Sequence, residues 1–235
     1  MMLMARKRAA ERRQPASKIV AVFNQKGGCG KTMTAMQVGG AIARRGFKSL
    51  VVDLDSQHTC VTWAAQAASE EPFPATVISL AGMGAKFLDQ LRKLAPDYDV
   101  ILLDCPPAIE SPIPWAALQI ADLGLIPIIP VFDNYWASKE AKELGLRAKT
   151  QNTNLQLFWL PSRMQRGKIY SECLKIIQND DIQSFENFFS QRNSYVECQP
   201  FGITVHGLSN PAAKQEVEAV TDELLGHLGL EETAQ

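Results

Sequence analysis

The stretch NQKGGCGKT at residues 24–32 decides the fold of this chain. An apolar run, IVAVF at 19–23, comes immediately before it, and a helix-like stretch from 31 to about 44 follows. Glycines let consecutive backbone N–H groups point into one concavity, and a helix N-terminus adds partial positive charge. A glycine loop between a strand and a helix therefore predicts a phosphate site. Lys31 is expected beside the β- and γ-phosphates, and the Thr32 hydroxyl on magnesium.

The loop departs from the usual phosphate-binding pattern at one position. That pattern has a glycine five residues before Gly30, where this chain has Gln25, and a second lysine, Lys26, follows. The string KGGCGKT resembles the deviant Walker A motif of the ParA/MinD family of ATPases, whose extra lysine reaches the partner subunit's nucleotide across a dimer interface. The resemblance implies catalytic roles for Lys26 and Lys31. It implies an ATP site made of Lys26, Gly27, Gly28, Cys29, Gly30, Lys31, Thr32 and Met33.

Two further apolar runs end in carboxylates. The run at 49–52 is followed by Asp53 and Asp55, and the run at 100–103 by Asp104. In an α/β sheet the ligand site lies at the carboxyl ends of the strands, and an acid there is costly unless paired, solvated or near a metal. An apolar strand that ends in aspartate is the Walker B arrangement, in which Asp104 holds magnesium through a water.

The string DLDSQ at 53–57 resembles the family's DxDPQ motif, with Ser56 where the family most often has proline. The resemblance places Asp53 near the magnesium shell and makes Asp55 the catalytic residue that positions the attacking water. The expected metal ligands are therefore Thr32, Asp53 and Asp104, and the expected cofactors are ATP and Mg²⁺.

Strand and helix patterns alternate along most of the chain, which predicts a parallel sheet. The expected fold is α/β, a P-loop NTPase with a mostly parallel twisted sheet and helices on both faces. We expect a single ATPase domain at 18–228, a basic disordered extension at 1–17 and a polar tail at 229–235. The extension has five basic residues against Glu11, a net charge of +4 in a chain whose total is −1. Such a tail is either a nucleic-acid contact or a solvated extension.

Several protein classes are disfavoured by composition. The five cysteines are odd in number and none has CxxC spacing, which argues against a disulfide framework, a zinc ribbon or an iron–sulfur site. No apolar run approaches the about 18 residues of a membrane span, and residues 1–13 lack the apolar region of a secretory signal. We therefore expect a cytoplasmic protein with no membrane partner.

Two basic loops are candidates for DNA contacts. In the ParA group a basic residue near the 162–168 loop contributes to non-specific DNA binding, which the resemblance carries to Arg166 and less directly to Arg163 and Lys168. The loop at 190–194 resembles a late family loop beside the adenine pocket and the DNA face, and it contains Arg192. An ordinary solvated loop is the alternative in both places.

The resemblance covers roughly residues 18–228 and implies a small ParA-type partition ATPase. It would form a homodimer on ATP binding, bind DNA non-specifically and associate with the nucleoid. With a ParB-like adaptor that stimulates its weak hydrolysis, it would segregate a plasmid or chromosome. Three alternatives stay open. A related ATPase positions a non-DNA cellular cargo, a MinD-like ATPase cycles on membranes through a basic C-terminal helix, and an iron–sulfur carrier needs paired cysteines.

Overall fold

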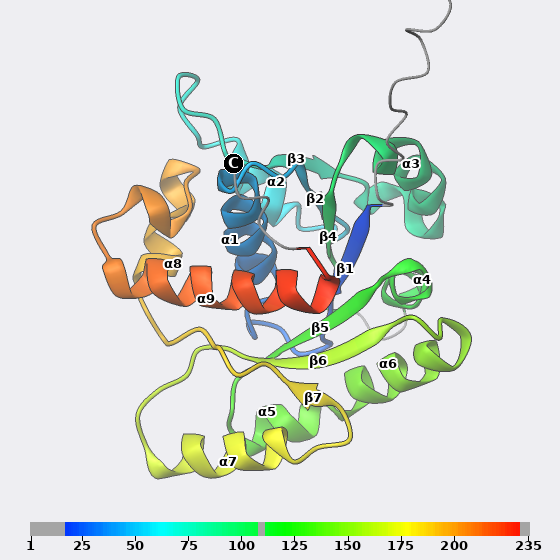
Figure 1. The fold of residues 1–235 in the computed structure, drawn as a ribbon, viewed down its shortest axis with the longest axis vertical. Helices are drawn as coiled ribbons and strands as arrows, with labels where there is room; N and C mark the ends of the chain where they lie inside the picture. The colour runs from blue at the N-terminus through cyan, green and yellow to red at the C-terminus, as the bar shows by residue number, and fades with distance from the viewer. Residues whose placement is uncertain (1–16, 108–110, 231–235) are drawn as a thin grey trace, which may run out of the picture.

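The computed structural model describes residues 17–107 and 111–230. Within them, one seven-stranded sheet has the order β3-β2-β4-β1-β5-β6-β7, and every neighbouring pair is parallel (Figure 1). The strands are β1 (Lys18–Val22), β2 (Ser49–Asp53), β3 (Thr76–Ser79), β4 (Val100–Asp104), β5 (Leu123–Ile128), β6 (Gln156–Pro161) and β7 (Gln183–Ser184). The predicted parallel α/β fold is confirmed.

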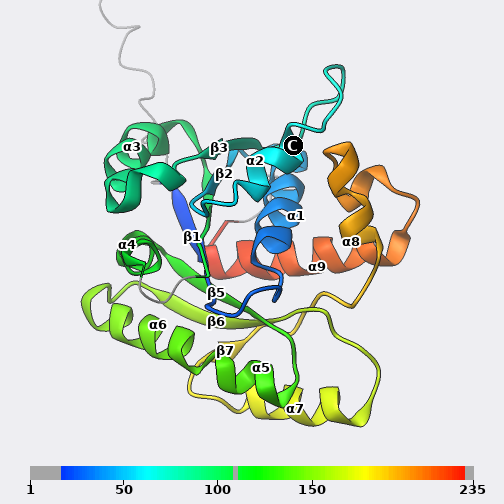
Figure 2. The same ribbon diagram turned by 180° about the vertical axis from the view of Figure 1, so that it is seen from behind.

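Helices cover both faces of the sheet (Figures 1 and 2). One layer contains α1 (Lys31–Arg44), α2 (Thr59–Ala64), α8 (Ser194–Glu197) and α9 (Pro211–Leu228). The other contains α3 (Phe87–Leu94), α4 (Pro112–Ile120), α5 (Phe132–Ala137), α6 (Lys139–Gln151) and α7 (Lys168–Gln178). Short 3₁₀ turns occur at Ala81–Lys86, Ala95–Asp97, Gln199–Phe201 and Val205–Gly207. None of the helices in the described ranges is long and apolar enough to cross a membrane.

The central strands are apolar throughout because both of their faces are covered. Alternate residues of β1 enter opposite layers: Val20 and Val22 pack under α1 and α9, whereas Ala21 packs under α4 and α6. All five residues of β2 and all five of β4 are buried. This two-sided burial is why these strands have continuous apolar sequences and not alternating ones.

Two glycines let α1 lie close to its neighbours. A Cβ on Gly39 would lie 2.5 Å from Val51 Cγ2 of β2, and one on Gly40 would lie 2.4 Å from Thr204 Cγ2. Neither distance is possible for a real side chain without movement. Gly39 therefore fixes how near α1, and with it the loop before α1, sits to the sheet, and Gly40 lets Thr204 approach α1.

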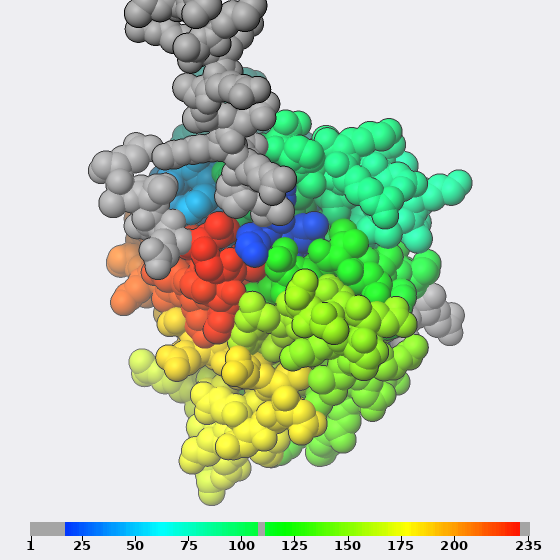
Figure 3. All heavy atoms as spheres, turned by 45° about the vertical axis from the view of Figure 1, so that its right-hand side comes forward, coloured from blue at the N-terminus to red at the C-terminus, as the bar shows by residue number. Residues whose placement is uncertain are grey.

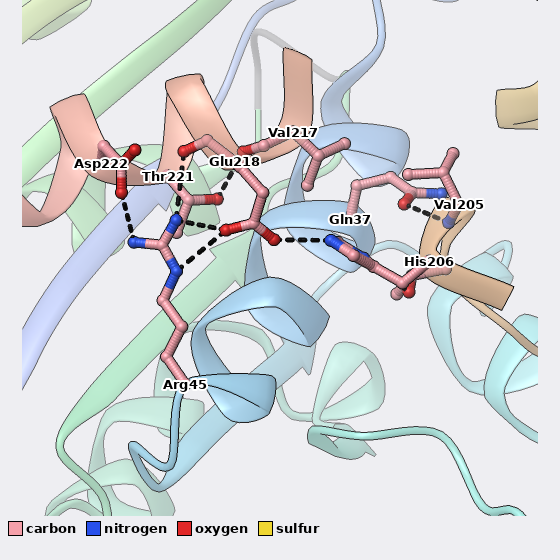
Figure 4. A network of polar contacts seen from close by, with 9 residues as sticks. Gln37, Arg45, Val205, His206, Val217, Glu218, Thr221 and Asp222 are labelled. Carbon is pink, nitrogen blue, oxygen red and sulfur yellow. Dashed lines mark hydrogen bonds and ion pairs between the residues drawn. The ribbon is translucent and has the colours of Figure 1, made fainter. Parts of the chain in front are cut away.

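A polar network joins the end of α1 to α9 (Figure 4). The Arg45 guanidinium, directly after α1, donates to Glu218 and pairs with Asp222, both on α9. His206 Nε2 lies 2.5 Å from the other oxygen of Glu218, and Gln37 Oε1 accepts a hydrogen bond from Val205 N at 3.0 Å. These contacts hold α9 across the outer side of α1.

The ends of the domain meet on one face of the molecule. The start of β1 reaches the surface beside the end of α9, as the blue and red atoms in Figure 3 show. The predicted extension and tail lie almost wholly in residues 1–16 and 231–235, outside the described residues. Element boundaries differ from the predicted ones by a few residues. The helix α5 was not predicted. Residues 185–189, for which the sequence predicts a short helix or strand, are neither.

Candidate nucleotide-binding site

The glycine loop joins β1 to α1, as the sequence predicts. Gly28 has a φ of +72° and Gly30 a φ of +104°, conformations that L side chains rarely adopt. Gly30 directly precedes the first residue of α1, and its carbonyl accepts the first hydrogen bond of the helix, from Thr34 N at 2.8 Å. The loop therefore wraps the N-terminus of a 14-residue helix, where anions are favoured.

The two lysines of the loop lie in different environments. Lys31 is only 7% exposed, and its Nζ donates to the carbonyl of Lys26 at 3.3 Å. Lys26 is exposed, and within the described ranges its ammonium forms no hydrogen bond or ion pair. Lys31 is thus held at the helix N-terminus, whereas the Lys26 ammonium is free to reach a group outside this chain.

A buried polar cluster stands beside the start of α1. Thr32 Oγ1 donates to Asp104 Oδ2 at 2.7 Å, and the Cys60 thiol lies 3.2 Å from the same oxygen. Asp104 is 1% exposed, and its Oδ1 has no hydrogen-bond partner. Burial raises the pKa of Asp104 to about 6, although the Thr32 and Cys60 hydrogen bonds oppose the rise.

This cluster fits a magnesium ion. A buried carboxylate oxygen without a partner is costly, and Mg²⁺ prefers carboxylate and hydroxyl oxygens as ligands. Ligand atoms of Asp53, Cys60 and Asp104 lie within 4.8 Å of one another. Thr32 and Asp104 are therefore the residues that would hold the ion, through its waters or directly.

Asp53 also has a structural role. Its Oδ2 accepts a hydrogen bond from Cys60 N at 2.9 Å and its Oδ1 one from Asp55 N at 3.1 Å. Asp53 therefore holds the loop between β2 and α2 and satisfies the start of that helix. Burial raises the pKa of Asp53, and these backbone N–H groups oppose the rise. Its place in the magnesium shell stays a prediction.

Asp55 lies at the rim of the site. It is half-exposed, its Oδ1 accepts a hydrogen bond from Gln57 N at 3.0 Å, and it lines the same cavity as the glycine loop. Asp55 therefore borders the space where phosphates would lie, which suits a residue that orients water. The water-positioning role itself is untested by the structure.

The cavity has a volume of about 340 Å³ and two walls. One wall is the glycine loop with Lys31, Thr32 and Met33. The second wall consists of Arg163, Ser190, Gln191, Arg192, Tyr195, Val196 and Gln199. A nucleotide whose phosphates lie on the glycine loop would extend its base toward this second wall. Sequence reasoning pointed to the 190–194 loop there but missed Tyr195, Val196 and Gln199, because no motif marks them.

Glu216 of α9 organises the second wall. It accepts hydrogen bonds from the Arg192 guanidinium, from Ser190 and, at 2.8 Å, from Tyr195 Oη. Burial raises the pKa of Glu216, but the bonds from Arg192 and Ser190 outweigh burial, so the pKa lies below its usual value. Arg192 is thus committed to a carboxylate of its own chain. Nothing in the sequence marks Glu216 as part of the site, because it lies 24 residues after Arg192 in the chain, on a helix without a functional motif.

The four predicted DNA contacts divide into two pairs. Arg163 Nη1 donates to the Gly28 carbonyl at 3.1 Å, and Arg192 pairs with Glu216, so both belong to the walls of the cavity. Arg166 is exposed on the 162–168 loop, and Lys168 is exposed with a loose 3.6 Å pairing to Glu172. DNA contact stays a prediction for all four: Arg163, Arg166 and Lys168 are exposed, whereas Arg192 is partly buried and paired with Glu216.

The fold and the site define a class. A parallel sheet, a glycine loop at a helix N-terminus and an aspartate at the end of the neighbouring strand are the parts of a P-loop nucleotide hydrolase. Residues 17–80 match the AAA domain family. The chain belongs to the ParA-type family of P-loop ATPases, and it is an ATP hydrolase that uses ATP and Mg²⁺.

Relatives differ in how much of the chain they match. The maintenance of carboxysome distribution protein A of Halothiobacillus neapolitanus is 31% identical over 209 residues, which is 88% of this chain and 95% of that protein. The chromosome-partitioning ATPase Soj of Thermus thermophilus is 32% identical over 136 residues, 46% of this chain and 53% of that protein. The chain thus spans about half of Soj but almost all of the carboxysome distribution protein.

Solved structures agree with the fold. Apo McdA of Cyanothece superposes with a TM-score of 0.75 at 20% identity and covers 88% of this chain and 99% of its own. MinD in the MinC:MinD cell division complex of Aquifex aeolicus superposes with a TM-score of 0.67 at 18% identity, covering 89% of this chain and 96% of its own. At these identities the likeness concerns the fold alone.

Proposed function

We propose that this ATPase positions a non-DNA cargo, a large protein assembly, inside the cell. The observation that carries the proposal is the match to the carboxysome distribution protein, which extends over 95% of that relative. The matches to partition proteins extend from about half of Soj of Thermus thermophilus to 86% of the ParA protein of Rhizobium radiobacter, the latter at only 24% identity. Plasmid or chromosome segregation, the main prediction from the sequence, is therefore less well supported than its alternative, the positioning of a non-DNA cargo.

The basic surface supports the same reading. Two of the four arginines and lysines predicted to contact DNA are held in the walls of the nucleotide cavity, Arg163 at Gly28 and Arg192 at Glu216. Glu216 compensates the charge of Arg192, so the exposed Arg163, Arg166 and Lys168 give a smaller electrostatic footprint for a polyanion than four uncompensated charges would. Weak DNA contact would still let the ATPase use the nucleoid as a track, while an adaptor connects it to the cargo.

The C-terminal helix supports a soluble cycle over a membrane-based one. The apolar residues of α9, including Val217, Val220 and Leu224, are fully buried against the domain core. A helix that binds a membrane needs a free apolar face beside a basic one. Since the apolar face of α9 is buried inside the fold, α9 is not available as the membrane-binding helix that a MinD-like ATPase would require.

The nucleotide cycle is part of the proposal. ATP and magnesium would close two subunits face to face, with the exposed Lys26 of each on the other's phosphates. Asp55 at the cavity rim would orient the attacking water, and hydrolysis would open the dimer. Within the described residues only Arg163 and Arg192 bring guanidinium groups to the cavity, and both are engaged with the chain itself, so slow turnover stimulated by an adaptor is expected.

A deletion strain of the host cell separates the two cargo readings. We expect its chromosome and plasmids to be inherited normally, scored as anucleate cells and as marker loss per generation. Electron tomography of the same cells should show a large protein assembly clustered instead of evenly spaced. The catalytic variant Asp55→Ala, expressed in that strain, should fail to restore the spacing. Increased DNA loss with unchanged assemblies would overturn cargo positioning and restore the partition reading.

Asp55 can be tested separately on the purified protein. Asp55→Ala should bind ATP but lose turnover by roughly a hundredfold, so that the ATP-bound dimer accumulates in light-scattering chromatography. Asp89→Ala, which removes an exposed carboxylate on α3, is the matched control and should turn over normally. Normal turnover in Asp55→Ala would contradict the role assigned to this residue.

A further inference from the structure

Arg163 has an unusual backbone conformation. It follows the end of β6 by two residues and has a φ of +52°. Among the non-glycine residues of the described ranges, His58 is the other with a positive φ. Such a conformation is unfavourable for a residue with a side chain and persists where the surroundings impose it, often at functional sites.

The neighbours of Arg163 are fixed on both sides. Ser162 N donates to the Ile128 carbonyl at 2.7 Å, and Met164 N donates to the Phe189 carbonyl at 2.9 Å. Met164 also forms a parallel bridge with Ser190. The chain is therefore held like a strand before and after Arg163. The left-handed residue between these two anchors directs its side chain to the nucleotide cavity.

The guanidinium joins the two walls of that cavity. Its Nη1 donates to the Gly28 carbonyl at 3.1 Å, and its Nε donates to Gln191 Oε1 at 2.8 Å. Gly28 belongs to the glycine loop and Gln191 to the second wall. A planar guanidinium has donors in a rigid fork and can bind two acceptors at once, whereas a lysine ammonium is a point charge on a flexible stem.

The Gly28 contact suits a phosphate site. The glycine loop binds phosphate through its N–H groups, so a loop carbonyl that turned toward the phosphates would repel them. A guanidinium bonded to that carbonyl holds its direction and compensates its partial negative charge. Arg163 therefore acts on the nucleotide through the loop.

We propose that Arg163 is a positioning residue for nucleotide binding, which fixes the Gly28 carbonyl of the glycine loop against Gln191 and so sets the spacing of the two cavity walls. This inference concerns ATP binding by the single chain and does not depend on which cargo the ATPase serves. It gives Arg163 a role in the nucleotide site in place of the predicted DNA contact.

The first test measures the Kd of a fluorescent ATP analogue with Mg²⁺ in buffer without DNA. Arg163→Ala should raise the Kd about tenfold, the cost of losing charged hydrogen bonds to two acceptors at an exposed site. Arg163→Lys should recover little of this loss, because an ammonium cannot hold both acceptors in a fixed geometry. Arg92→Ala, which removes an exposed arginine on α3, is the charge control and should leave the Kd unchanged.

A double-mutant cycle tests the bridge itself. Gln191→Ala should raise the Kd by a smaller factor, and Arg163→Ala combined with Gln191→Ala should bind no more weakly than Arg163→Ala alone. Additive effects would mean that the two residues act separately, and full recovery in Arg163→Lys would mean that charge alone matters. Either result overturns the proposal, as does an unchanged Kd in Arg163→Ala.

Arg163→Gly separates positioning from folding. Glycine adopts the positive φ without strain, so the Tm of this variant without nucleotide should equal or exceed that of Arg163→Ala. Its Kd for the ATP analogue should nevertheless be raised as much as in Arg163→Ala. Wild-type affinity in Arg163→Gly would show that the guanidinium is not needed and would overturn the inference.

Discussion

The two lysines of the glycine loop stand five residues apart and belong to different parts of the site. Lys31 lies at the inner end, 7% exposed, next to a cluster in which Thr32, Cys60 and Asp104 contact one another. Lys26 lies at the outer rim, exposed, directly before Gly27, which lines the cavity. The inner end is connected by hydrogen bonds within one chain. The rim lysine has no partner in the described part of this chain.

This difference indicates which functions one subunit can perform alone. A buried, hydrogen-bonded end can bind phosphate and magnesium without a second copy, because its groups are already held in place. An exposed lysine gains little from a phosphate that water still surrounds, but much more from one that a second subunit encloses. The inner end should therefore govern nucleotide affinity, and the rim should govern dimerisation and turnover.

The largest effect is expected at the inner end. Lys31→Ala should weaken the binding of a fluorescent ATP analogue by about a hundredfold or more, since it removes charge-assisted bonds to two phosphates. Isothermal titration with ATP and Mg²⁺ gives the same quantity without a label. If Lys31→Ala bound ATP within about threefold of the unaltered protein, the proposed division of the two lysines would be wrong.

The rim lysine should give the reverse pattern. Lys26→Ala is expected to bind ATP within about threefold of the unaltered protein but to stay monomeric with ATP and Mg²⁺ in light-scattering chromatography. Its matched control is Lys86→Ala, which removes a lysine after the β3 strand, away from the cavity. Survival of the ATP-dependent dimer in Lys26→Ala would contradict the cross-subunit role.

Asp104 allows a test of the buried cluster through pH. The pKa of Asp104 is raised from 3.8 to about 6 in the fold. Protonated Asp104 therefore stabilises the fold fully below pH 4, and this stabilisation is lost as the pH rises through 6. Ionised Asp104 then costs the magnesium-free fold on the order of 3 kcal/mol at pH 8. The free energy of unfolding of Asp104→Asn, relative to the unaltered protein, should therefore increase between pH 4 and pH 8. Urea unfolding at several pH values measures it.

Stabilisation by ATP and Mg²⁺ gives a second test with the same variant, Asp104→Asn. ATP with Mg²⁺ should raise the Tm of the unaltered protein by several degrees and that of Asp104→Asn by much less, because the carboxylate ligand is gone. An equal rise in both would mean that Asp104 does not hold the ion. A pH-independent difference in unfolding free energy would mean that the carboxylate is not desolvated in the fold.

The smallest effect is expected at the second wall. Glu216→Gln keeps the shape of the side chain but removes the charge that binds Arg192, so it should lower the free energy of unfolding by about 1 kcal/mol. The affinity for ATP should fall only two- to threefold. Because the pKa of Glu216 is lowered in the fold, the stability it adds is present above its ordinary pKa of 4.5 and is lost at lower pH. Glu172→Gln, exposed on α7, should change neither quantity.

The sequence was sufficient for the parts of the site that form locally. The strand, glycine loop and helix around Lys31 are contiguous, so their order alone predicts the phosphate site. Asp53 and Asp104 follow apolar strands, and parallel strands bring their carboxyl ends to one edge of the sheet. That is why two aspartates 51 positions apart could be assigned to one place without a structure.

The remaining parts depend on contacts between distant residues. Arg163 and Arg192 were predicted to contact DNA, because their acceptors, Gly28 and Glu216, lie 135 and 24 residues away and no motif indicates them. Cys60 reaches Asp104 from 44 residues away, and no spacing in the sequence marks it. The helix α5 was missed because six residues are too few to show a helical repeat. Long-range partners, not local propensity, decide these positions.

All five cysteines, Cys29, Cys60, Cys105, Cys173 and Cys198, are buried. A maleimide dye reacts with accessible thiolates, and burial raises the pKa of these thiols above the usual value. The native chain is thus already a background of low reactivity. One cysteine introduced at Val196, which is 64% exposed on the second wall, would accept a single fluorophore. Such a probe would report nucleotide entry and subunit closure in real time, with none of the native thiols removed.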